Sequence, residues 1–405
     1  MTDSKSASAV AYLDHAATTA MRPAALAALT ESAVELGNPS SLHSAGRRSR
    51  RIVEESRESI ADRLGVRPSD VVFTSGGTEA DNLAIKGLFW AAVAADPDRN
   101  TVLVSTIEHH AVLDAVEWLV DHEGARVEWI PAGINGQVDV DWLAERLARD
   151  ASHIALCAVM WANNETGVVQ PVESIAAMCE EYEIPFHCDG VQAVAWLPEP
   201  ARWRSRKSSL AISAHKFGGP VGVGALVVNG VTPHPLFHGG GQEIDVRSGT
   251  VATALIASAA AALHETASNR SIEVPRVREL SQRLRAGIAT VAPESVVVGE
   301  ASERLAGINS VAFPGCQADA LLMLLDSVGV ACSAGSACTA GVPRPSHVLL
   351  AMGVPSDQAQ GTLRFSLGWN SQPSDVDALI AALPAVLERA RRANRGGSRV
   401  AAGAS

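Results

Sequence analysis

Short apolar runs alternate with segments of helical period through the first part of this chain. In residues 111–120 and 172–182 the apolar positions recur every three to four residues, which is typical of helices that bury one face. Parallel strands joined through helices form a sheet that is covered on both faces. The alternation therefore predicts an α/β fold with a largely parallel sheet. The runs that we expect to form strands are residues 71–74, 101–104, 127–130, 154–159 and 225–228.

The pattern changes after Thr250, where an alanine-rich helix, a second helix near residues 277–291 and widely spaced strands are expected. A chain of 405 residues with 47% apolar content can bury one large core and a smaller one. We expect a large domain over residues 16–258 and a smaller α+β domain from residues 1–15 and 259–393. Residues 394–405 are rich in Gly, Ala, Ser and Arg and are predicted to be a disordered tail.

Charge and hydropathy exclude several classes of protein. Forty-four acidic against thirty-three basic residues give a net charge of −11, which opposes binding to nucleic acid. The sequence has neither an apolar run of membrane-spanning length nor a basic, apolar N-terminal signal, so we expect a cytoplasmic protein without membrane contact. Its six cysteines show no CxxC and no paired metal spacing, and no metal site is predicted.

Two residues indicate the chemistry, namely Lys216 and Cys338. Lys216 stands between an apolar strand and a Gly-Gly-Pro turn, where partial burial would lower its pKa and let it form a Schiff base with a carbonyl cofactor. Cys338 lies among Ser, Ala and Gly, which indicates a loop and an unhindered nucleophile. Together they predict amino-acid chemistry performed on sulfur.

Two further motifs fit a phosphorylated pyridine cofactor. Gly77 and Thr78 follow a predicted strand and open a helix, where backbone N–H groups bind phosphate, although the same residues also make an ordinary turn and cap. Asp189 ends a short strand and is a candidate partner for a pyridine nitrogen, the alternative being a helix N-cap. Gln192 is placed to donate to the phenolic oxygen of such a cofactor.

His109 and Asn164 each follow a further predicted strand. A histidine at a strand end can stack on a flat cofactor, but a lone histidine is more often a packing residue. Asn163 and Asn164 read otherwise as a turn.

Ten motifs in order make the chain resemble the NifS/IscS-type cysteine desulfurases, from about residue 11 to residue 390. Residues 341–342 and 345–349 are shared with the actinobacterial members in particular, and the likeness is closest to those. The ten motifs are DHAATT at 14–19, SGGTE at 75–79, EHHAV at 108–112, NNETG at 163–167, Asp189-x-x-Gln192, SAHK at 213–216, HGGGQE at 238–243, RSGT at 247–250, GSACT at 335–339 and RFSLG at 364–368.

The resemblance implies the PLP-dependent transferase fold of type I, with a mainly parallel seven-stranded sheet in the large domain and the Cys338 loop in the small one. It implies that Lys216 binds pyridoxal 5'-phosphate (PLP), that Asp189 pairs with its ring nitrogen and that His109 stacks on the ring and relays protons. Gln192 would contact the phenolic oxygen. The remaining implied contacts are Gly77, Thr78, Ser213 and His215 with the phosphate, Thr250 with the phosphate of a partner subunit, Asn164 with cofactor and substrate, and Arg364 with the substrate carboxylate.

The same resemblance implies conversion of L-cysteine to L-alanine, with a persulfide on Cys338 that passes to a sulfur acceptor. The acceptor would be an iron–sulfur scaffold or a thiolation enzyme, and the enzyme would be a homodimer. Two alternatives remain, another PLP-dependent aminotransferase or lyase of this fold and a non-catalytic scaffold. One stretch departs from the family pattern: residues 202–207 are basic, which predicts an altered surface that suits a particular partner.

Overall fold

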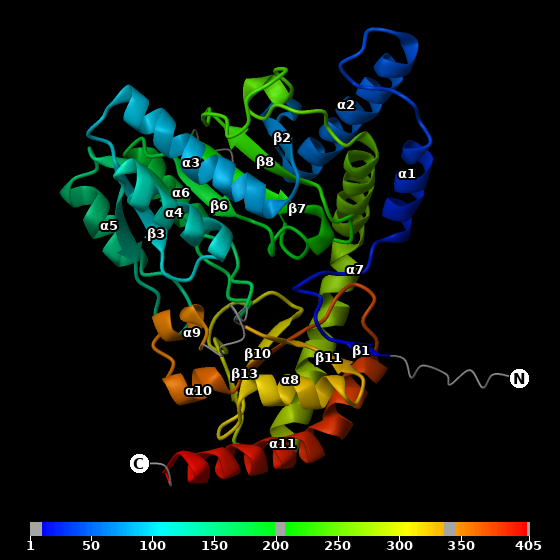
Figure 1. Cartoon of the computed structure of the whole chain (residues 1–405), viewed down its shortest axis with the longest axis vertical. Helices are drawn as coiled ribbons and strands as arrows, with labels where there is room; N and C mark the ends of the chain where they lie inside the picture. Colours follow the sequence, from blue (N-terminus) through cyan, green and yellow to red (C-terminus); the bar gives the residue numbers. More distant parts are fainter. Residues whose placement is uncertain (1–9, 199–206, 336–344, 403–405) are drawn as a thin grey trace, which may run out of the picture.

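The computed structural model describes residues 10–198, 207–335 and 345–402 of the chain, and its centre is a seven-stranded sheet (Figure 1). The strand order is β2-β8-β7-β6-β5-β3-β4, and only β8 runs antiparallel to its neighbours. All five runs predicted as strands are strands here, and the predicted mainly parallel, seven-stranded sheet is confirmed. The strands are β2 (Val71–Thr74), β3 (Thr101–Ser105), β4 (Arg126–Ile130), β5 (Ile154–Ala158), β6 (Phe186–Asp189), β7 (Ser208–Ser213) and β8 (Gly224–Asn229).

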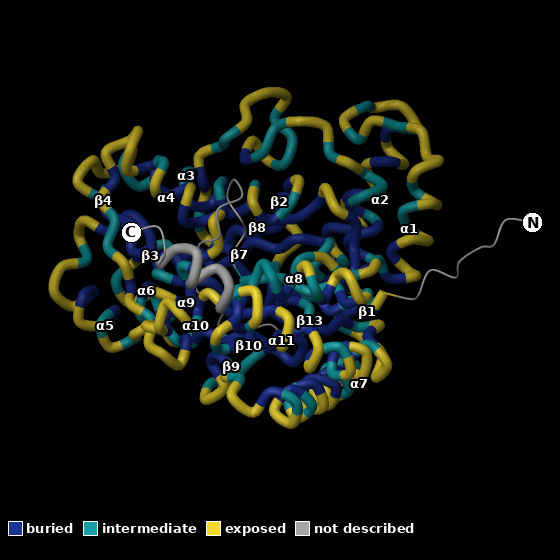
Figure 2. The backbone as a smooth tube through the Cα atoms, turned by 60° about the horizontal axis from the view of Figure 1, so that its bottom comes forward, coloured by how far each residue is buried: buried dark blue, intermediate teal, exposed yellow. Residues whose placement is uncertain are grey.

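Helices cover both faces of this sheet because both faces of its central strands are apolar. On β7, Leu210 and Ile212 belong to one core and Ala211 to the opposite one. The first core is closed by α2 (Ser44–Leu64), α5 (Val140–Arg149), α6 (Val172–Glu181) and the start of α7 (Thr253–Val291). The other face is covered by α3 (Gly77–Ala95) and α4 (His110–Glu123). Figure 2 shows the central strands as the buried interior.

A second, antiparallel sheet lies below the first in Figure 1, in the order β12-β13-β10-β9. Its strands are β9 (Val296–Val297), β10 (Ile308–Ala312), β12 (Ser333–Ala334) and β13 (Thr362–Ser366). It shares a separate apolar core with the second half of α7, with α8 (Ala318–Asp326) and with α11 (Pro373–Ala402). Beside it, β1 (Ala11–Tyr12) pairs in parallel with β11 (Val330–Ala331), which joins the N-terminal strand to this second unit.

Helix α7 is continuous over 39 residues, where the sequence predicted two helices. Its first half packs in the core of the large sheet through Ile256 and Leu263, and its second half packs in the other core through Val277 and Leu284. Pro275 lies inside the helix without ending it, because helix-forming residues and buried contacts continue on both sides. The proposed division at residue 258 falls inside this helix and stays a prediction.

The C-terminal helix differs from the expectation. Helix α11 continues to Ala402, past residue 394, where a disordered tail was predicted. An amphipathic helix already docked through Leu379, Leu383 and Leu387 is extended easily by Ala and Arg, which are strong helix formers. The basic stretch predicted to be an altered surface lies outside the described residues except for Lys207.

The remaining elements are short or peripheral. Helix α1 (Pro23–Ala33) packs beside α7, and α9 (His347–Ala351) and α10 (Ser356–Gln360) precede β13. Single 3-10 turns are formed by Pro68–Asp70, Ala214–Lys216 and Glu243–Asp245. No helix in the described part of the chain is long and apolar enough to cross a membrane.

Candidate active site

A cavity of about 730 Å³ lies where the carboxyl ends of the parallel strands face the second sheet. Ligands bind at this edge of open α/β sheets because the loops that follow several strands converge there. Ten of the residues predicted for the site line the cavity. These are Gly77, Thr78, His109, Asn164, Asp189, Gln192, Ser213, His215, Lys216 and Arg364.

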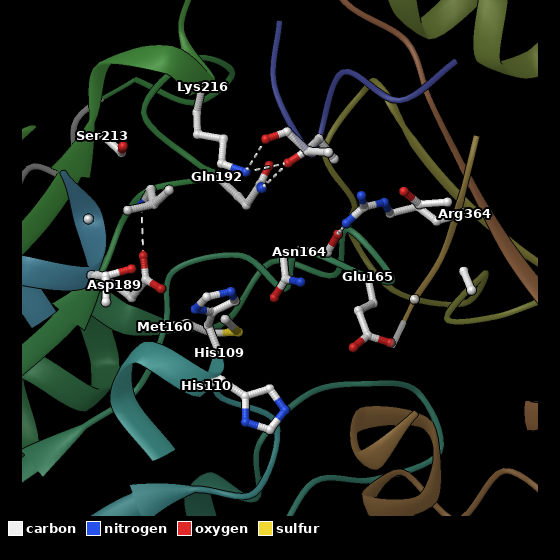
Figure 3. Close-up of a pocket in the computed structure, with 18 of the residues that line it drawn as sticks. His109, His110, Met160, Asn164, Glu165, Asp189, Gln192, Ser213, Lys216 and Arg364 are labelled. Atoms are coloured by element: carbon white, nitrogen blue, oxygen red, sulfur yellow. Dashed lines mark hydrogen bonds between the residues drawn. The ribbon is translucent and has the colours of Figure 1, made fainter. Parts of the chain in front are cut away.

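Lys216 stands at the end of the 3-10 turn that follows β7, and its amine points toward two backbone carbonyl groups (Figure 3). Its Nζ donates hydrogen bonds to the carbonyl oxygens of Ala16 and Ala17, at 2.6 and 2.8 Å. Burial, and then the positive charge of Arg364, lower the pKa of Lys216 to about 8. About a tenth of this amine is therefore neutral and nucleophilic at pH 7, far more than for an ordinary lysine.

Asp189 ends β6 at the floor of the cavity, and the structure buries its side chain. Its Oδ1 accepts a hydrogen bond from the backbone N–H of Val191 at 2.9 Å. Burial raises the pKa of Asp189, and nearby His109 and Lys216 oppose that rise. A buried carboxylate of this kind is stabilised by a protonated ring nitrogen placed against it.

His109 is the N-cap of α4, and its ring faces the cavity beside Asp189 (Figure 3). Its Nδ1 accepts from the backbone N–H of Ala111 at 3.1 Å, which leaves the ring proton on Nε2. Burial lowers the pKa of His109, so the ring is neutral. Stacking of this ring on a cofactor stays a prediction.

The N-terminus of α3 has features that fit the anion site predicted from the glycines. No side chain caps this 19-residue helix at Gly76, so its first N–H groups lack a side-chain acceptor. A Cβ on Gly77 would lie 2.7 Å from Cγ2 of Val191, so only glycine lets the backbone approach here. Ser213 and His215 line the same cavity. Exposed helix N–H groups beside a hydroxyl and an imidazole fit a phosphate.

Arg364 lies on β13 of the second sheet and closes the opposite side of the cavity. Its Nη2 donates to Oδ1 of Asp14 at 3.0 Å and its Nη1 to the carbonyl of Asn164 at 2.9 Å. Its Nε is buried and has no hydrogen-bond partner. A guanidinium fixed in this way presents a fork that matches a carboxylate.

Of the other two predicted residues, only Thr250 is described by the structure. Thr250 lines a separate cavity of about 650 Å³ together with Gly241 and Glu243, and its assigned contact with a partner subunit stays a prediction. Cys338 lies outside the described residues. Gly335 and Pro345, the described residues that flank its segment, both line the cavity.

Some residues of the site were not predicted from the sequence. Asp81 lines the cavity from α3, and its Oδ1 lies 3.1 Å from Nε2 of His187, a fully buried residue on β6. The signal for Asp81 was its spacing, because it falls one helical turn after Gly77 and so lies on the same face of α3. Glu165, His347 and Cys332 also line the cavity, and only the fold brings them there.

The cavity fits PLP on observations of its own. The uncapped end of α3 can bind a phosphate, and a protonated ring nitrogen would stabilise the buried carboxyl group of Asp189. The amine of Lys216 can react with a carbonyl group. In the described residues no group of three or more His, Cys, Asp and Glu side chains is placed to hold a metal ion.

Comparisons with known proteins agree with this geometry. The family model for class-V aminotransferases matches residues 11–379. An IscS-like cysteine desulfurase of the actinobacterium Mycobacterium tuberculosis is 49% identical over 398 residues, which cover 98% of this chain and 100% of that relative. A cysteine desulfurase of Cereibacter sphaeroides is 40% identical over 386 residues, covering 94% of this chain and 96% of that relative.

Among solved structures, a NifS-like protein superimposes with a TM-score of 0.85 at 31% identity, over 94% of this chain and 99% of the other. The extent of these matches leaves no large segment of the fold unaccounted for. The chain belongs to the class-V aminotransferase family, among its NifS/IscS-type cysteine desulfurases, whose members depend on PLP.

Proposed function

We propose that this protein is a PLP-dependent cysteine desulfurase that converts L-cysteine to L-alanine and places the sulfur on Cys338 as a persulfide. One observation carries the proposal: the amine of Lys216, the buried carboxyl of Asp189 and the fixed guanidinium of Arg364 face a single cavity. The family to which the chain belongs supports the same activity. The segment that contains Cys338 is flanked by Gly335 and Pro345 at that cavity.

PLP, when bound, supplies a carbonyl for amines and a protonated ring that takes up the charge left on Cα when its proton leaves. Lys216 would hold the cofactor, and its amine would take up that proton. Asp189 keeps the ring nitrogen protonated. The first turn of α3 at Gly77 and Thr78 binds the phosphate, with help from Ser213 and His215.

Three other groups orient ring and substrate. Neutral His109 stacks on the ring and relays a proton through Nε2, while Gln192 donates to the phenolic oxygen. Gln192 Nε2 now donates to the Ala16 carbonyl at 2.8 Å, the same oxygen that Lys216 contacts. Arg364 binds the substrate carboxylate, and Asn164 lies beside it.

Sulfur transfer is a displacement at the substrate sulfur. The Cys338 thiolate attacks that sulfur, an S–S bond forms as the Cβ–S bond breaks, and the electron pair stays with the carbon fragment, which takes up protons to become L-alanine. An ordinary thiol of pKa about 8.5 is only a few per cent ionised at pH 7, so a base must assist this step. His109, which lines the cavity, would serve as that base.

The finer properties of the enzyme belong to the same proposal. It acts as a cytoplasmic homodimer in which Thr250 contacts the phosphate of the partner subunit. The persulfide passes to an iron–sulfur scaffold protein or to a thiolation enzyme. The basic residues 202–207 form part of the surface that such an acceptor meets.

The test is to measure L-alanine and sulfide released from L-cysteine by PLP-loaded protein with a thiol reductant, beside the Cys338→Ala variant. Equal amounts of both products from the parent protein, lost in the variant, would support the proposal. A yellow, PLP-bearing protein that releases no L-alanine would refute it and favour another PLP reaction. Alanine formation that survives in the variant would refute the role of Cys338.

A further inference from the structure

The carboxyl group of Glu165 meets both ends of the segment that carries Cys338. Glu165 follows β5, lines the cavity and is 3% exposed (Figure 3). One end of the segment is Gly335, directly after β12, and the other is Ser346, the N-cap of α9. Two positions eleven residues apart are thus joined through a single side chain from the large unit.

The contact with Gly335 leaves no room for a side chain there. A Cβ on Gly335 would overlap Oε2 of Glu165 and lie 3.0 Å from its Cδ. Gly335 continues from β12, whose Ser333 is paired with Arg364 on β13. The carboxyl group therefore packs directly on the backbone at the point where the chain leaves the second sheet.

The contact with Ser346 is a hydrogen bond. Ser346 Oγ donates to Oε2 of Glu165 at 2.5 Å and accepts from the backbone N–H of Leu349 at 3.2 Å, so one hydroxyl caps α9 and binds the carboxyl group. The next residue, His347, donates through Nε2 to the carbonyl of Glu108 at 3.0 Å. The returning end of the segment is thereby tied to the large unit at two places.

Hydrogen bonds to the side chain of Asn163 fix the backbone of Glu165. Asn163 Oδ1 accepts from the backbone N–H groups of Glu165 and Thr166, both at 2.9 Å, and Asn163 Nδ2 donates to the carbonyl of Ile107 at 3.0 Å. A buried carboxyl group with a rigid backbone is costly unless it forms its hydrogen bonds. Loss of the hydrogen bond with Ser346 would therefore be costly in free energy, and this cost keeps the Glu165 side chain directed toward Ser346.

We propose that Glu165 is a positioning residue that holds together Gly335 and Ser346, the two described ends of the segment that contains Cys338, and thereby supports the step that needs this cysteine. The proposal rests on the desulfurase function. Glu165 touches neither of the groups assigned to hold the cofactor, Lys216 and Asp189, in any hydrogen bond of the described structure. It therefore affects the step that needs Cys338 more than the binding of PLP or L-cysteine.

The experiment compares Glu165→Ala, Glu165→Gln and Ser346→Ala in the PLP-loaded, full-length protein. Binding of L-cysteine is followed by the absorbance of the cofactor, and the persulfide on Cys338 is counted by alkylation and mass spectrometry after one turnover. Loss of one buried hydrogen bond corresponds to about a tenfold change. We expect the rate of persulfide formation to fall at least about tenfold in Glu165→Ala and in Ser346→Ala, with PLP content and KM for L-cysteine within about twofold.

Glu165→Gln separates positioning from charge. The amide oxygen of glutamine still accepts from Ser346 Oγ and fills the same space against Gly335, so this variant is expected to stay within about threefold of the parent rate. The double variant Glu165→Ala with Ser346→Ala should be no more than about twofold slower than either single one, because both remove the same contact. Glu117→Ala, an exposed residue on α4, is the matched control.

The possible failures are distinguishable. If the parent protein forms neither L-alanine nor persulfide, the desulfurase function is refuted. If the parent reacts and Glu165→Ala forms persulfide at the same rate, the positioning role is refuted. A Glu165→Gln variant as slow as Glu165→Ala would overturn it in favour of a charge effect. A raised KM with unchanged kcat would make Glu165 a substrate-binding residue instead.

Discussion

Arg364 and Asp14 form an ion pair across the cavity wall, with Nη2 of the arginine 3.0 Å from Oδ1 of the aspartate. The two residues are 350 positions apart, and β13 and the segment after β1 bring them together. The pair fixes the plane of the guanidinium, whose other nitrogen Nη1 is held by the carbonyl of Asn164. The proposed carboxylate site at Arg364 would therefore need little further ordering of the arginine on binding.

The first prediction concerns this arginine. Arg364→Lys keeps the charge but removes the fork, so the KM for L-cysteine should rise about ten- to hundredfold, which is the value of one charge-assisted hydrogen bond of about 1.5–3 kcal/mol. PLP content should not change. Steady-state kinetics of L-alanine formation give the KM, and the absorbance of the cofactor gives the PLP content. An unchanged KM would show that Arg364 does not bind the substrate carboxylate.

The second prediction concerns the pH dependence of cofactor uptake. The pKa of Lys216 is lowered to about 8, chiefly by burial, and only its neutral amine reacts with PLP. The rate at which apoprotein takes up PLP should therefore rise about tenfold per pH unit below 8 and level off above it. Absorbance after mixing at a series of pH values gives the profile. A rate that still climbs tenfold per unit near pH 10 would indicate an ordinary lysine.

The third prediction concerns acid stability. His15 is hydrogen-bonded to Thr19 and Ser371, and burial lowers its pKa to about 4. Because an unfolded histidine titrates near 6.5, the unfolded state binds the proton first, and stability is lost as the pH falls from 6.5 towards 4. Between pH 7 and pH 5 the titration of this residue should lower the free energy of unfolding by about 2 kcal/mol.

The variant His15→Gln removes that titration. Urea unfolding at pH 7 and pH 5 should therefore show the parent protein losing about 2 kcal/mol more than the variant does. Comparing the change with pH, rather than the stability at one pH, cancels the altered hydrogen bonds to Thr19 and Ser371. Equal losses in both proteins would show that His15 takes up a proton in the folded state.

The fourth prediction concerns Cys332, which lines the cavity at the second sheet. Burial, and next the negative charge of Asp14, raise the pKa of its thiol to about 12. At pH 8 roughly one thiol in ten thousand is ionised, so iodoacetamide should label Cys332 about a thousandfold more slowly than a free cysteine. Peptide mass mapping after timed labelling measures the rate. Fast labelling would make Cys332 a second reactive thiol.

Local sequence predicted much of the site because its residues stand directly after strands. Asp189 ends β6, while His109 and Lys216 follow β3 and β7, and the carboxyl ends of these parallel strands meet at one edge of the sheet. The alternation of apolar runs and helices was enough to predict that sheet. Helix α7 was mistaken for two helices because the sequence around Pro275 carries a local helix-breaking signal, and only packing on both sides overrides it.

The sequence by itself thus determined the sheet, the strand-end positions of the cofactor residues and the family, because each depends on short-range pattern or on motifs in order. Only the tertiary structure decided that Asp14 fixes Arg364, that Asp81 lies against His187 and that Glu165 meets Gly335 and Ser346. The lowered pKa of Lys216 was expected in direction from its sequence position, but its size follows from burial. Burial and long-range contacts arise from how distant segments pack, and no local pattern encodes them.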